Sequence, residues 1–348
     1  MISGETTMEK VRIVLYGIGA VGSMIAKSLI QKKGIQIVGA IDVAKDKVDK
    51  DLGVVLGLER KLRITVTDDV DSLLTHTKPD IVVHATSSFL KDTYAQISSV
   101  LKHGVDIVST CEELSYPFHT EPKMAKDLDL LAKKHDATVL GTGINPGFLM
   151  DTLVIILTAP CQKIEKIEVT RVMNAATRRL PFQKKVGAGL AVGEFQNKIQ
   201  KEEITGHVGL EQSIAMIADA LGWKLDQIRA EPVEAVRARK AVENGEIRIR
   251  VGDVAGIRQK AKGLRKGEEI IVLDFRAYVG AEEEYDAITI TGSPNIKQKI
   301  QPCVHGDVGT VAMIINMIPK VIKAPAGLLT MKDVQIPSAT LEDMRKYC

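Results

Sequence analysis

Three glycines near the N-terminus have the spacing of a phosphate-binding turn. An apolar run, residues 11–16, leads directly into Gly17-Ile18-Gly19-Ala20-Val21-Gly22, and a helical pattern follows. In this spacing the first glycine allows a tight turn, the second lets a pyrophosphate approach the backbone, and the third lets the helix pack closely on the strand. The helix N-terminus offers free N–H groups and a positive dipole end to phosphate oxygens. The sequence therefore predicts that residues 17–22 hold the pyrophosphate of a dinucleotide.

The residues that would hold the rest of the dinucleotide follow later apolar runs. Asp42 ends the second run, twenty residues after the last glycine of the turn. A carboxylate at this place can accept a hydrogen bond from a ribose 2′-hydroxyl, which favours NAD. Lys45 and Lys47 follow closely and can instead pair with the 2′-phosphate of NADP, so dual specificity stays open. Thr86 and Ser87 follow the fourth run, and their small side chains would let the dinucleotide lie along the sheet edge.

Two adjacent carboxylates, Glu112 and Glu113, come directly after the fifth apolar run. Ligands of parallel α/β sheets bind beyond the carboxyl ends of the strands, so this segment would lie near the nicotinamide. A carboxylate there can serve as a general base, with its pKa raised by burial. The alternative is that both carboxylates cap the following helix or face solvent. Because the two are neighbours in the chain, we expect only one of them to point inward.

A third segment with polar residues, 141–151, follows the sixth apolar run and contains Asn145 and Phe148. The Asn145 amide can hydrogen-bond a substrate or the nicotinamide amide. It can equally cap a helix that begins at Pro146, because asparagine before a proline at the first helical position is favourable capping chemistry. Phe148 belongs to the same candidate substrate-binding segment.

Three residues of the second half are further candidates for substrate binding. Arg171 lies within a strand pattern and can clamp a carboxylate, or it is an exposed strand arginine. His207 lies between two glycines, which suggests a close approach to the backbone. His305 precedes a helix start. For each histidine a structural role is the alternative.

The elements that position these residues differ between the two halves of the chain. Up to about residue 145, Val- and Ile-rich apolar runs alternate with amphipathic stretches, which predicts a parallel sheet with right-handed crossovers. The runs are residues 11–16, 36–41, 63–66, 80–85, 106–109 and 138–141. Beyond residue 151, two helices are followed by long alternating segments between turn signals, which predicts an antiparallel sheet with one wet face.

The expected fold class is therefore α/β, with a Rossmann-type parallel sheet domain and an α+β substrate-binding and dimerisation domain. The expected boundaries are residues 8–150 for the first domain and 151–303 for the second. Residues 304–348 would form a helix, ended by Pro319, and a tail that packs back on the first domain.

The composition excludes several classes of function. The net charge of +3 is spread along the 348 residues, whereas nucleic-acid binding usually needs a clustered basic face. No apolar run approaches the roughly 20 residues that a membrane-spanning helix needs. The four cysteines are far apart, which favours free thiols in a reducing cytoplasm, and no cysteines or histidines have the spacing of metal ligands.

Four motifs together resemble the family of 2,4-diaminopentanoate dehydrogenase and the related native amine dehydrogenases, which share a dihydrodipicolinate-reductase-like architecture. They are the glycine turn and the segments 110–117, 143–148 and 206–213, and the resemblance covers almost the whole chain from residue 8. It implies that a short amine, such as 2,4-diaminopentanoate, is reversibly deaminated by NAD or NADP to a ketone, 2-amino-4-oxopentanoate, and ammonia. The family's proton-handling carboxylate maps to the Glu112–Glu113 pair, and we favour Glu112. The resemblance also implies a homodimer formed through the sheet of the second domain.

Two other readings remain. One is a different oxidoreductase on the same scaffold, similar to homoserine dehydrogenase or dihydrodipicolinate reductase. The first of these tends to have lysine where this chain has glutamate, and the second usually has a His-His-x-x-Lys motif that this sequence lacks. The other is a non-catalytic protein that senses NAD(P), which would keep the glycine turn and need no inward carboxylate.

Overall fold

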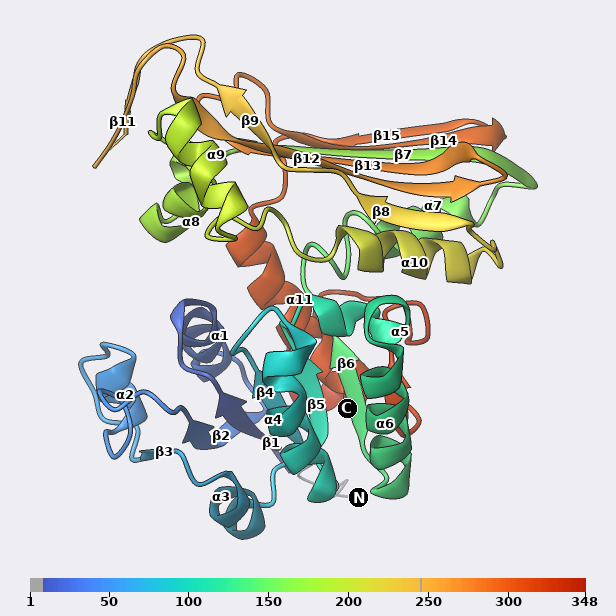
Figure 1. Cartoon of the computed structure of the whole chain (residues 1–348). Helices are drawn as coiled ribbons and strands as arrows, with labels where there is room; N and C mark the ends of the chain where they lie inside the picture. The colour runs from blue at the N-terminus through green and yellow to red at the C-terminus, as the bar shows by residue number, and fades with distance from the viewer. Residues whose placement is uncertain (1–8, 245) are drawn as a thin grey trace. The chain divides into compact units, whose positions relative to one another are not determined.

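The computed structural model describes residues 9–244 and 246–348, so residue 8, the expected start of the first domain, lies outside the described part (Figure 1). The chain divides into two compact units. The first unit comprises the chain up to Phe148 together with Gly306–Cys348, and the second comprises Leu149–His305. No helix of the described part is long and apolar enough to span a membrane.

The sheet of the first unit has seven strands, all paired in parallel, in the order β16-β6-β5-β4-β1-β2-β3. The strands are β1 (Val11–Tyr16), β2 (Ile35–Ile41), β3 (Val66–Thr67), β4 (Ile81–His84), β5 (Asp106–Ser109), β6 (Thr138–Gly141) and β16 (Gly327–Leu329). Nearly every residue of the central strands is buried, as expected for a sheet with both faces covered. The chain direction across the sheet reverses between β1 and β4, which is where ligands of such sheets bind.

Helices cover both faces of this sheet. They are α1 (Ala20–Ile30), α2 (Leu52–Val55), α3 (Val70–Thr77), α4 (Leu90–Lys102), α5 (Pro117–Thr120), α6 (Pro122–Lys134) and α11 (Gly306–Ile322), with short 3₁₀ helices at Glu113–Ser115 and Met344–Lys346. α4 packs against both α3 and α6, and α1 packs beside α11, which contacts β4, β5 and β6. The last part of the chain thus supplies both a covering helix, α11, and the edge strand β16 (Figure 1).

The prediction that Pro319 ends the last long helix is wrong, because α11 continues to Ile322. A proline inside a helix loses one backbone hydrogen bond and crowds the preceding turn. Here Pro319 lies within the final turn, and its neighbours Ile318 and Val321 are fully buried. The apolar packing of that turn offsets the missing hydrogen bond.

The second unit has a mixed, mainly antiparallel sheet in the order β15-β14-β7-β13-β12-β8, with β9 also paired to β12. Its strands are β7 (Lys163–Asn174), β8 (Gln227–Ala230), β9 (Glu234–Arg237), β12 (Val254–Arg265), β13 (Glu268–Tyr278), β14 (Tyr285–Ser293) and β15 (Ile296–Ile300). Only the β7–β13 pair among these is parallel. A separate hairpin joins β10 (Val242–Asn244) to β11 (Ile247–Ile249). Together with the parallel sheet of the first unit, this confirms the expected fold class.

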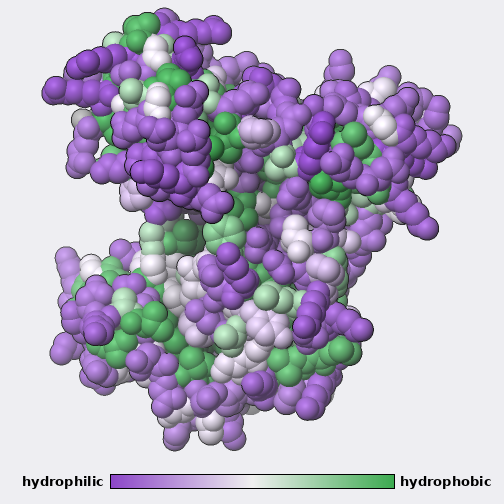
Figure 2. All heavy atoms as spheres, in the orientation of Figure 1, coloured by the Kyte–Doolittle hydropathy of each residue, from purple (hydrophilic) through white to green (hydrophobic). Residues whose placement is uncertain are grey.

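The helices of the second unit are α7 (Thr152–Thr158), α8 (Leu180–Lys185), α9 (Val192–Gln200) and α10 (Leu210–Ala220), with a 3₁₀ helix at Ala175–Thr177. α10 packs on β12, β8 and β13. On β12, Ile257 and Ala261 are buried on the face toward α10, whereas Lys260 and Lys262, on either side of Ala261, point to the opposite face and are half-buried. Hydrophilic residues dominate the visible surface of the protein, with scattered apolar patches (Figure 2).

A polar row crosses the buried face of this sheet. Gln259, Phe275, Arg171 and Asp286 are successive lateral neighbours on β12, β13, β7 and β14. Arg171 is 1% exposed; its guanidinium donates to Asp286 Oδ1 at 2.5 Å and to the Val304 carbonyl at 2.5 Å. The expectation of an exposed strand arginine is therefore wrong, and the carboxylate that Arg171 holds belongs to Asp286.

We predict that removing one member of this ion pair destabilises the protein much more than removing both. Burial raises the pKa of the Asp286 carboxyl, and Arg171 opposes that effect. Arg171→Met leaves a buried carboxylate without its cation and should lower the free energy of unfolding by about 3–5 kcal/mol. Arg171→Met combined with Asp286→Leu should recover most of this loss. Urea unfolding of both variants measures the difference, and equal stability of the single variant and the wild type would contradict the prediction.

Candidate functional site

The glycines at positions 17 and 22 are required by the shape of the turn itself. Gly17 has φ +93°, and a Cβ added to it would lie 2.4 Å from the Ala85 carbonyl oxygen. A Cβ on Gly22 would lie 1.9 Å from the Gly17 carbonyl oxygen. Side chains at either position would push the turn away from β4 or push α1 away from the turn, so the geometry of the predicted phosphate site depends on both glycines.

Gly19 differs from the other two, because a Cβ at this position would meet no protein atom within 4 Å. Gly19 is the N-cap of α1 and supplies no capping side chain, and both Gly19 and Ala20 are exposed. No side chain therefore caps the first-turn N–H groups of α1, and a phosphate bound beside Gly19 would be stabilised by the helix dipole. These residues fit the pyrophosphate of NAD or NADP. The side chain of Ile18 is buried, and Val21 is half-buried.

Asp42 follows β2 and is tied to the glycine turn. Its Oδ2 accepts hydrogen bonds from the Ile18 N–H at 2.8 Å and from Lys47 Nζ at 2.9 Å, and its Oδ1 accepts from the Ala44 N–H at 2.9 Å. Burial alone would raise the pKa of this carboxyl, but the hydrogen bonds from Lys47, Ala44 and Ile18 bring it below its usual value. A carboxylate accepts about four hydrogen bonds, so Asp42 retains capacity for one more donor, such as a ribose hydroxyl. Lys47 is held by Asp42, whereas Lys45 is exposed.

Thr86 and Ser87 follow β4, and Thr86 lies beside the glycine turn. The Cγ2 atom of Thr86 is 2.8 Å from the Cβ position that Gly17 lacks, so the two segments are in direct contact. Ser87 Oγ donates to Asp92 Oδ2 at 2.9 Å. Thr86 is exposed at this edge of the sheet, and Ser87 is half-buried.

The two glutamates after β5 have different surroundings. Glu113 Oε2 accepts a hydrogen bond at 2.7 Å from the N–H of Leu90, the first residue of α4. The N-cap of that helix, Phe89, supplies no side-chain cap, so the Glu113 carboxylate takes its place. Burial raises the pKa of Glu113. The alternative that the glutamates cap the following helix is therefore wrong for Glu113, because the helix that it caps, α4, precedes it in the chain.

Glu112 is half-buried at the start of the 3₁₀ helix Glu113–Ser115. Its carbonyl oxygen accepts from the Ser115 hydroxyl at 2.7 Å, which stabilises the turn. This turn packs against Gly141 at the end of β6, where a Cβ would lie 2.5 Å from the Leu114 carbonyl carbon. Gly141 therefore sets how closely the segment with Glu112 approaches the carboxyl edge of the sheet, a constraint that the sequence did not reveal.

Residues 145–151 form turns, so the prediction of a helix that starts at Pro146 is wrong. Gly147 has φ +124°, which a helix does not allow. α7 begins instead at Thr152, whose N–H donates to the Asp151 carboxylate at 2.6 Å. Asn145 is half-buried just beyond β6 and is not a cap for this helix, and Phe148 is half-buried as well.

In the second unit, His207 stacks on Phe275 with ring centroids 4.3 Å apart. The backbone N–H of His207 donates to Gln259 Oε1 at 2.8 Å. A Cβ on Gly206, which has φ +77°, would lie 2.5 Å from that same oxygen, so the close approach that the glycines predict is to Gln259. Burial, with the nearby charges of Lys185 and Arg171, lowers the pKa of His207 to about 3, which leaves its imidazole neutral.

The structure thus gathers most of the predicted residues in two places. In the first unit, residues 17–22, Asp42, Thr86, Ser87 and Glu112 all lie at the carboxyl ends of the parallel strands. In the second unit, His207 joins the polar row of Arg171, whereas His305 is exposed ahead of α11. Within the described residues, no three His, Cys, Asp or Glu side chains are grouped to hold a metal ion.

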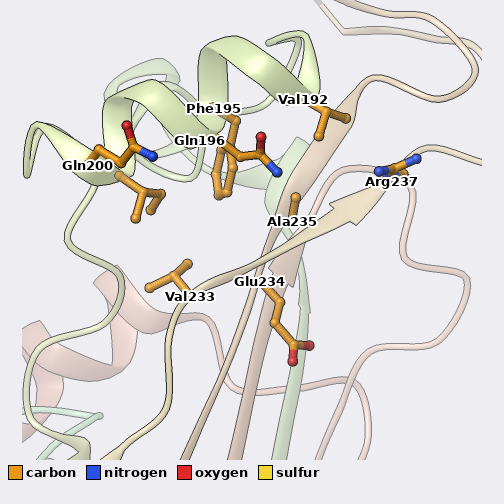
Figure 3. A pocket seen from close by; sticks show the side chains of 9 residues that line it. Val192, Phe195, Gln196, Gln200, Val233, Glu234, Ala235 and Arg237 are labelled. Carbon is orange, nitrogen blue, oxygen red and sulfur yellow. The ribbon is translucent and has the colours of Figure 1, made fainter.

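A separate pocket of about 630 Å³ lies between α9 and β9 (Figure 3). Phe195 and Val192 of α9 face Val233 and Ala235 across it. None of its lining residues is a predicted site residue, so it takes no part in the site described above.

Comparisons with known proteins agree with both units. Residues 148–348 match the family model of the 2,4-diaminopentanoate dehydrogenase C-terminal domain, and residues 11–112 match that of the dihydrodipicolinate reductase N-terminus. The chain is 34% identical to the 2,4-diaminopentanoate dehydrogenase of Acetoanaerobium sticklandii, over 97% of each protein. It is 23% identical to an amine dehydrogenase of Streptomyces virginiae, over 94% of this chain and 96% of that one. The structure of an amine dehydrogenase from Mycobacterium smegmatis superposes with a TM-score of 0.83 and 28% identity, over 96% of this chain and 99% of that one.

Because Gly19 and Gly22 have different surroundings, we predict that replacing each by alanine affects stability and NAD⁺ binding differently. Gly19→Ala should leave the melting temperature unchanged, because the new Cβ meets no protein atom, and should weaken NAD⁺ binding by about tenfold or more, because it occupies the path of the pyrophosphate. Gly22→Ala should lower both the melting temperature and the affinity. Thermal unfolding and fluorescence titration with NAD⁺ measure the two effects. Unchanged affinity in Gly19→Ala would refute the assigned position of the pyrophosphate.

Proposed function

Because this chain belongs to the 2,4-diaminopentanoate dehydrogenase family and is an NAD(P)-dependent amine dehydrogenase, we propose that it reversibly deaminates a short amine such as 2,4-diaminopentanoate. The products are 2-amino-4-oxopentanoate and ammonia. The observation that carries this proposal is the 34% identity to a 2,4-diaminopentanoate dehydrogenase along 97% of both chains. The half-buried Glu112 at the carboxyl edge of the sheet supports it.

The reaction needs a group that moves protons beside the carbon that is oxidised. The bound nicotinamide supplies the hydride acceptor. Glu112 would take a proton from the substrate ammonium, so that the amine-bearing carbon can lose its hydride and become an imine. Glu112 would next release this proton to solvent, take a proton from the water that attacks the protonated imine, and pass it to the nitrogen. The C–N bond then breaks, ammonia leaves, and the remaining hydroxyl proton goes to the carboxylate as the ketone forms. A positioned carboxylate in this role supplies about 10²–10⁴-fold in rate.

Glu112 is preferred over Glu113 because the Glu113 carboxylate is already committed to the backbone of α4. Moving Glu113 away from the Leu90 N–H would leave the first turn of α4 without its cap. The carbonyl oxygen of Glu112 accepts the Ser115 hydroxyl at 2.7 Å, which stabilises the 3₁₀ turn that presents Glu112 at this edge.

The other site residues are assigned by their place in each unit. Residues 17–22 would hold the pyrophosphate, Asp42 the adenosine ribose, and Thr86 and Ser87 the stretch of cofactor along the sheet edge. Asn145 and Phe148, just beyond β6, and the neutral imidazole of His207 are proposed substrate contacts, and His305 is a further one. Arg171 is not, because its guanidinium is engaged by Asp286 and Val304.

We also propose that the protein is a homodimer formed through the face of the second sheet opposite α10. Asp274 on this face is only 7% exposed and accepts hydrogen bonds from both Arg258 and Arg276 at 2.6 Å. Such paired charges suit a polar interface. Light scattering during size-exclusion chromatography gives the mass, and the mass of a single chain would contradict the dimer.

Glu112→Gln tests the assignment of the base. It should lower kcat by about 10²–10⁴-fold while the Kd of NAD⁺ stays within about twofold, because the amide keeps the shape of the side chain and cannot take a proton. The matched control is Glu113→Gln, which weakens the cap of α4 and should lower stability far more than kcat. Full activity of Glu112→Gln would remove Glu112 from the mechanism.

The substrate is tested by mixing the purified protein with 2,4-diaminopentanoate and NAD⁺ or NADP⁺ and following the reduced cofactor by absorbance. In the reductive direction, 4-oxopentanoate, which has the reacting ketone and lacks the 2-amino group of the proposed product, should oxidise NADH or NADPH together with ammonia. The wild type should be active in at least one direction with at least one cofactor. Failure in both directions with both cofactors would rule out this substrate class.

A further inference from the structure

A buried histidine, His84, stands between the cofactor edge and the segment that contains Glu112. It is the last residue of β4 and is 1% exposed. Its Nδ1 lies 2.8 Å from Ser109 Oγ, and its Nε2 lies 2.8 Å from Gln96 Oε1. Thr86 Oγ1 donates to the same Gln96 oxygen at 2.7 Å and lies 3.0 Å from the imidazole. The contacts of His84 thus extend to both strand ends that border the proposed reaction centre.

The hydrogen bonds determine the state of the imidazole. Burial lowers the pKa of His84 to about 4, although the hydrogen bond to Gln96 opposes this shift, so the ring is neutral near pH 7. The amide oxygen of Gln96 can only accept, so Nε2 carries the proton. Nδ1 must then accept the proton of the Ser109 hydroxyl. The Ser109 oxygen in turn accepts the N–H of Cys111 at 3.1 Å.

The hydrogen bonds form a continuous chain through the imidazole, which donates at Nε2 and accepts at Nδ1. On one side, Nε2–H and the Thr86 hydroxyl both donate to Gln96. On the other side, the Cys111 N–H donates to Ser109, and Ser109 donates to Nδ1. Cys111 directly precedes Glu112, and Thr86 contacts Gly17 of the phosphate turn.

We propose that His84 is a positioning residue that holds Thr86 and the Cys111–Glu112 segment at a fixed separation beyond the ends of β4 and β5. The inference rests on the proposed function only in giving Glu112 a chemical role. In this proposal the hydrogen bonds of His84 keep Glu112 at a fixed distance from the residues that would bind the cofactor.

Backbone hydrogen bonds give part of this link, because the Thr110 N–H donates to the His84 carbonyl at 3.0 Å and the Glu113 N–H donates to the Ser88 carbonyl at 3.1 Å. None of these backbone bonds reaches Thr86 or the Cys111 N–H. His84 and Ser109 are lateral neighbours in the last rung of the β4–β5 pair, and the strands end there. Past that rung the side chains of His84 and Ser109 continue the link. The ring of Tyr16 on β1 meets the imidazole edge to face, at 5.3 Å between centroids, and holds it from the other side. A displacement of about 1 Å between reacting groups can cost about 10²-fold in rate, so such a link has a measurable effect.

The test uses His84→Phe, which keeps a flat ring and removes both nitrogens. In the protein without substrate, amide exchange of residues 109–115 should accelerate about tenfold or more, because Ser109 Oγ, the acceptor of the Cys111 N–H, is no longer oriented by Nδ1 of the imidazole. The kcat should fall about 10- to 100-fold, and the Kd of NAD⁺ should change by a smaller factor. Ser109→Ala should give the same pattern, and the double variant should be no worse than the worse single one, because both changes break one chain.

Two further variants separate positioning from mere stability. His84→Asn keeps an acceptor near the place of Nδ1 and should restore slow exchange at residues 109–115 and part of the lost kcat. Thr138→Val removes a buried hydroxyl that donates to the Pro325 carbonyl at 3.1 Å, at the opposite end of the sheet. It should lower the melting temperature and leave kcat and the exchange of residues 109–115 unchanged.

The proposal is overturned if His84→Phe leaves exchange of residues 109–115 unchanged, or if its kcat equals that of the wild type while only the melting temperature falls. Should His84→Phe fail to fold, Ser109→Ala decides by the same readouts. The exchange measurement does not depend on Glu112. If Glu112→Gln is active and exchange is faster in His84→Phe, the proposed base is refuted and the positioning role of His84 stands. If Glu112→Gln is inactive and exchange in His84→Phe is unchanged, only the positioning role is refuted.

Discussion

The rest of the first unit depends on one close contact, between the Gly17 carbonyl and Gly22. A Cβ added to Gly22 would lie only 1.9 Å from the Gly17 carbonyl oxygen. The contact forces the chain to turn sharply between β1 and α1, which leaves the N–H groups of the helix facing outward above Gly19. The Ile18 N–H then donates to Asp42, which joins the turn to the end of β2. Because Thr86 lies directly against Gly17, the end of β4 is joined to the turn as well. One steric constraint thus relates the ends of three strands.

Much of this arrangement could be predicted from the sequence, because it depends on local patterns. Strands buried on both faces are nearly continuous in apolar residues, and β1, β5 and β6 have the predicted bounds. The glycine turn is recognisable because each glycine answers a local steric demand. The resemblance of the motifs to a known family extended the interpretation to the reaction, and the comparisons confirm the family and an amine dehydrogenase activity.

What the sequence could not predict depends on partners that are distant in the chain. Glu113 caps a helix that begins 23 residues earlier, and Arg171 pairs with Asp286 115 residues later. Neither partner can be read from the residues around it. The end of the last helix was missed for a similar reason, since the burial of the turn around Pro319 is a property of the folded core. His84 shows the same limit, because its role follows from Ser109 and Gln96 in other elements.

The edge strand β16 has a consequence for how the chain is made. β16 and α11 belong to the first unit, yet the ribosome synthesises them only after the whole of Leu149–His305. Domains generally fold as units while the chain emerges. Here the second unit can form its core while β6 still lacks its outer neighbour and the sheet lacks the helix that covers β4, β5 and β6. The order of synthesis therefore gives the inserted unit the first opportunity to fold, and the cofactor-binding unit is completed last.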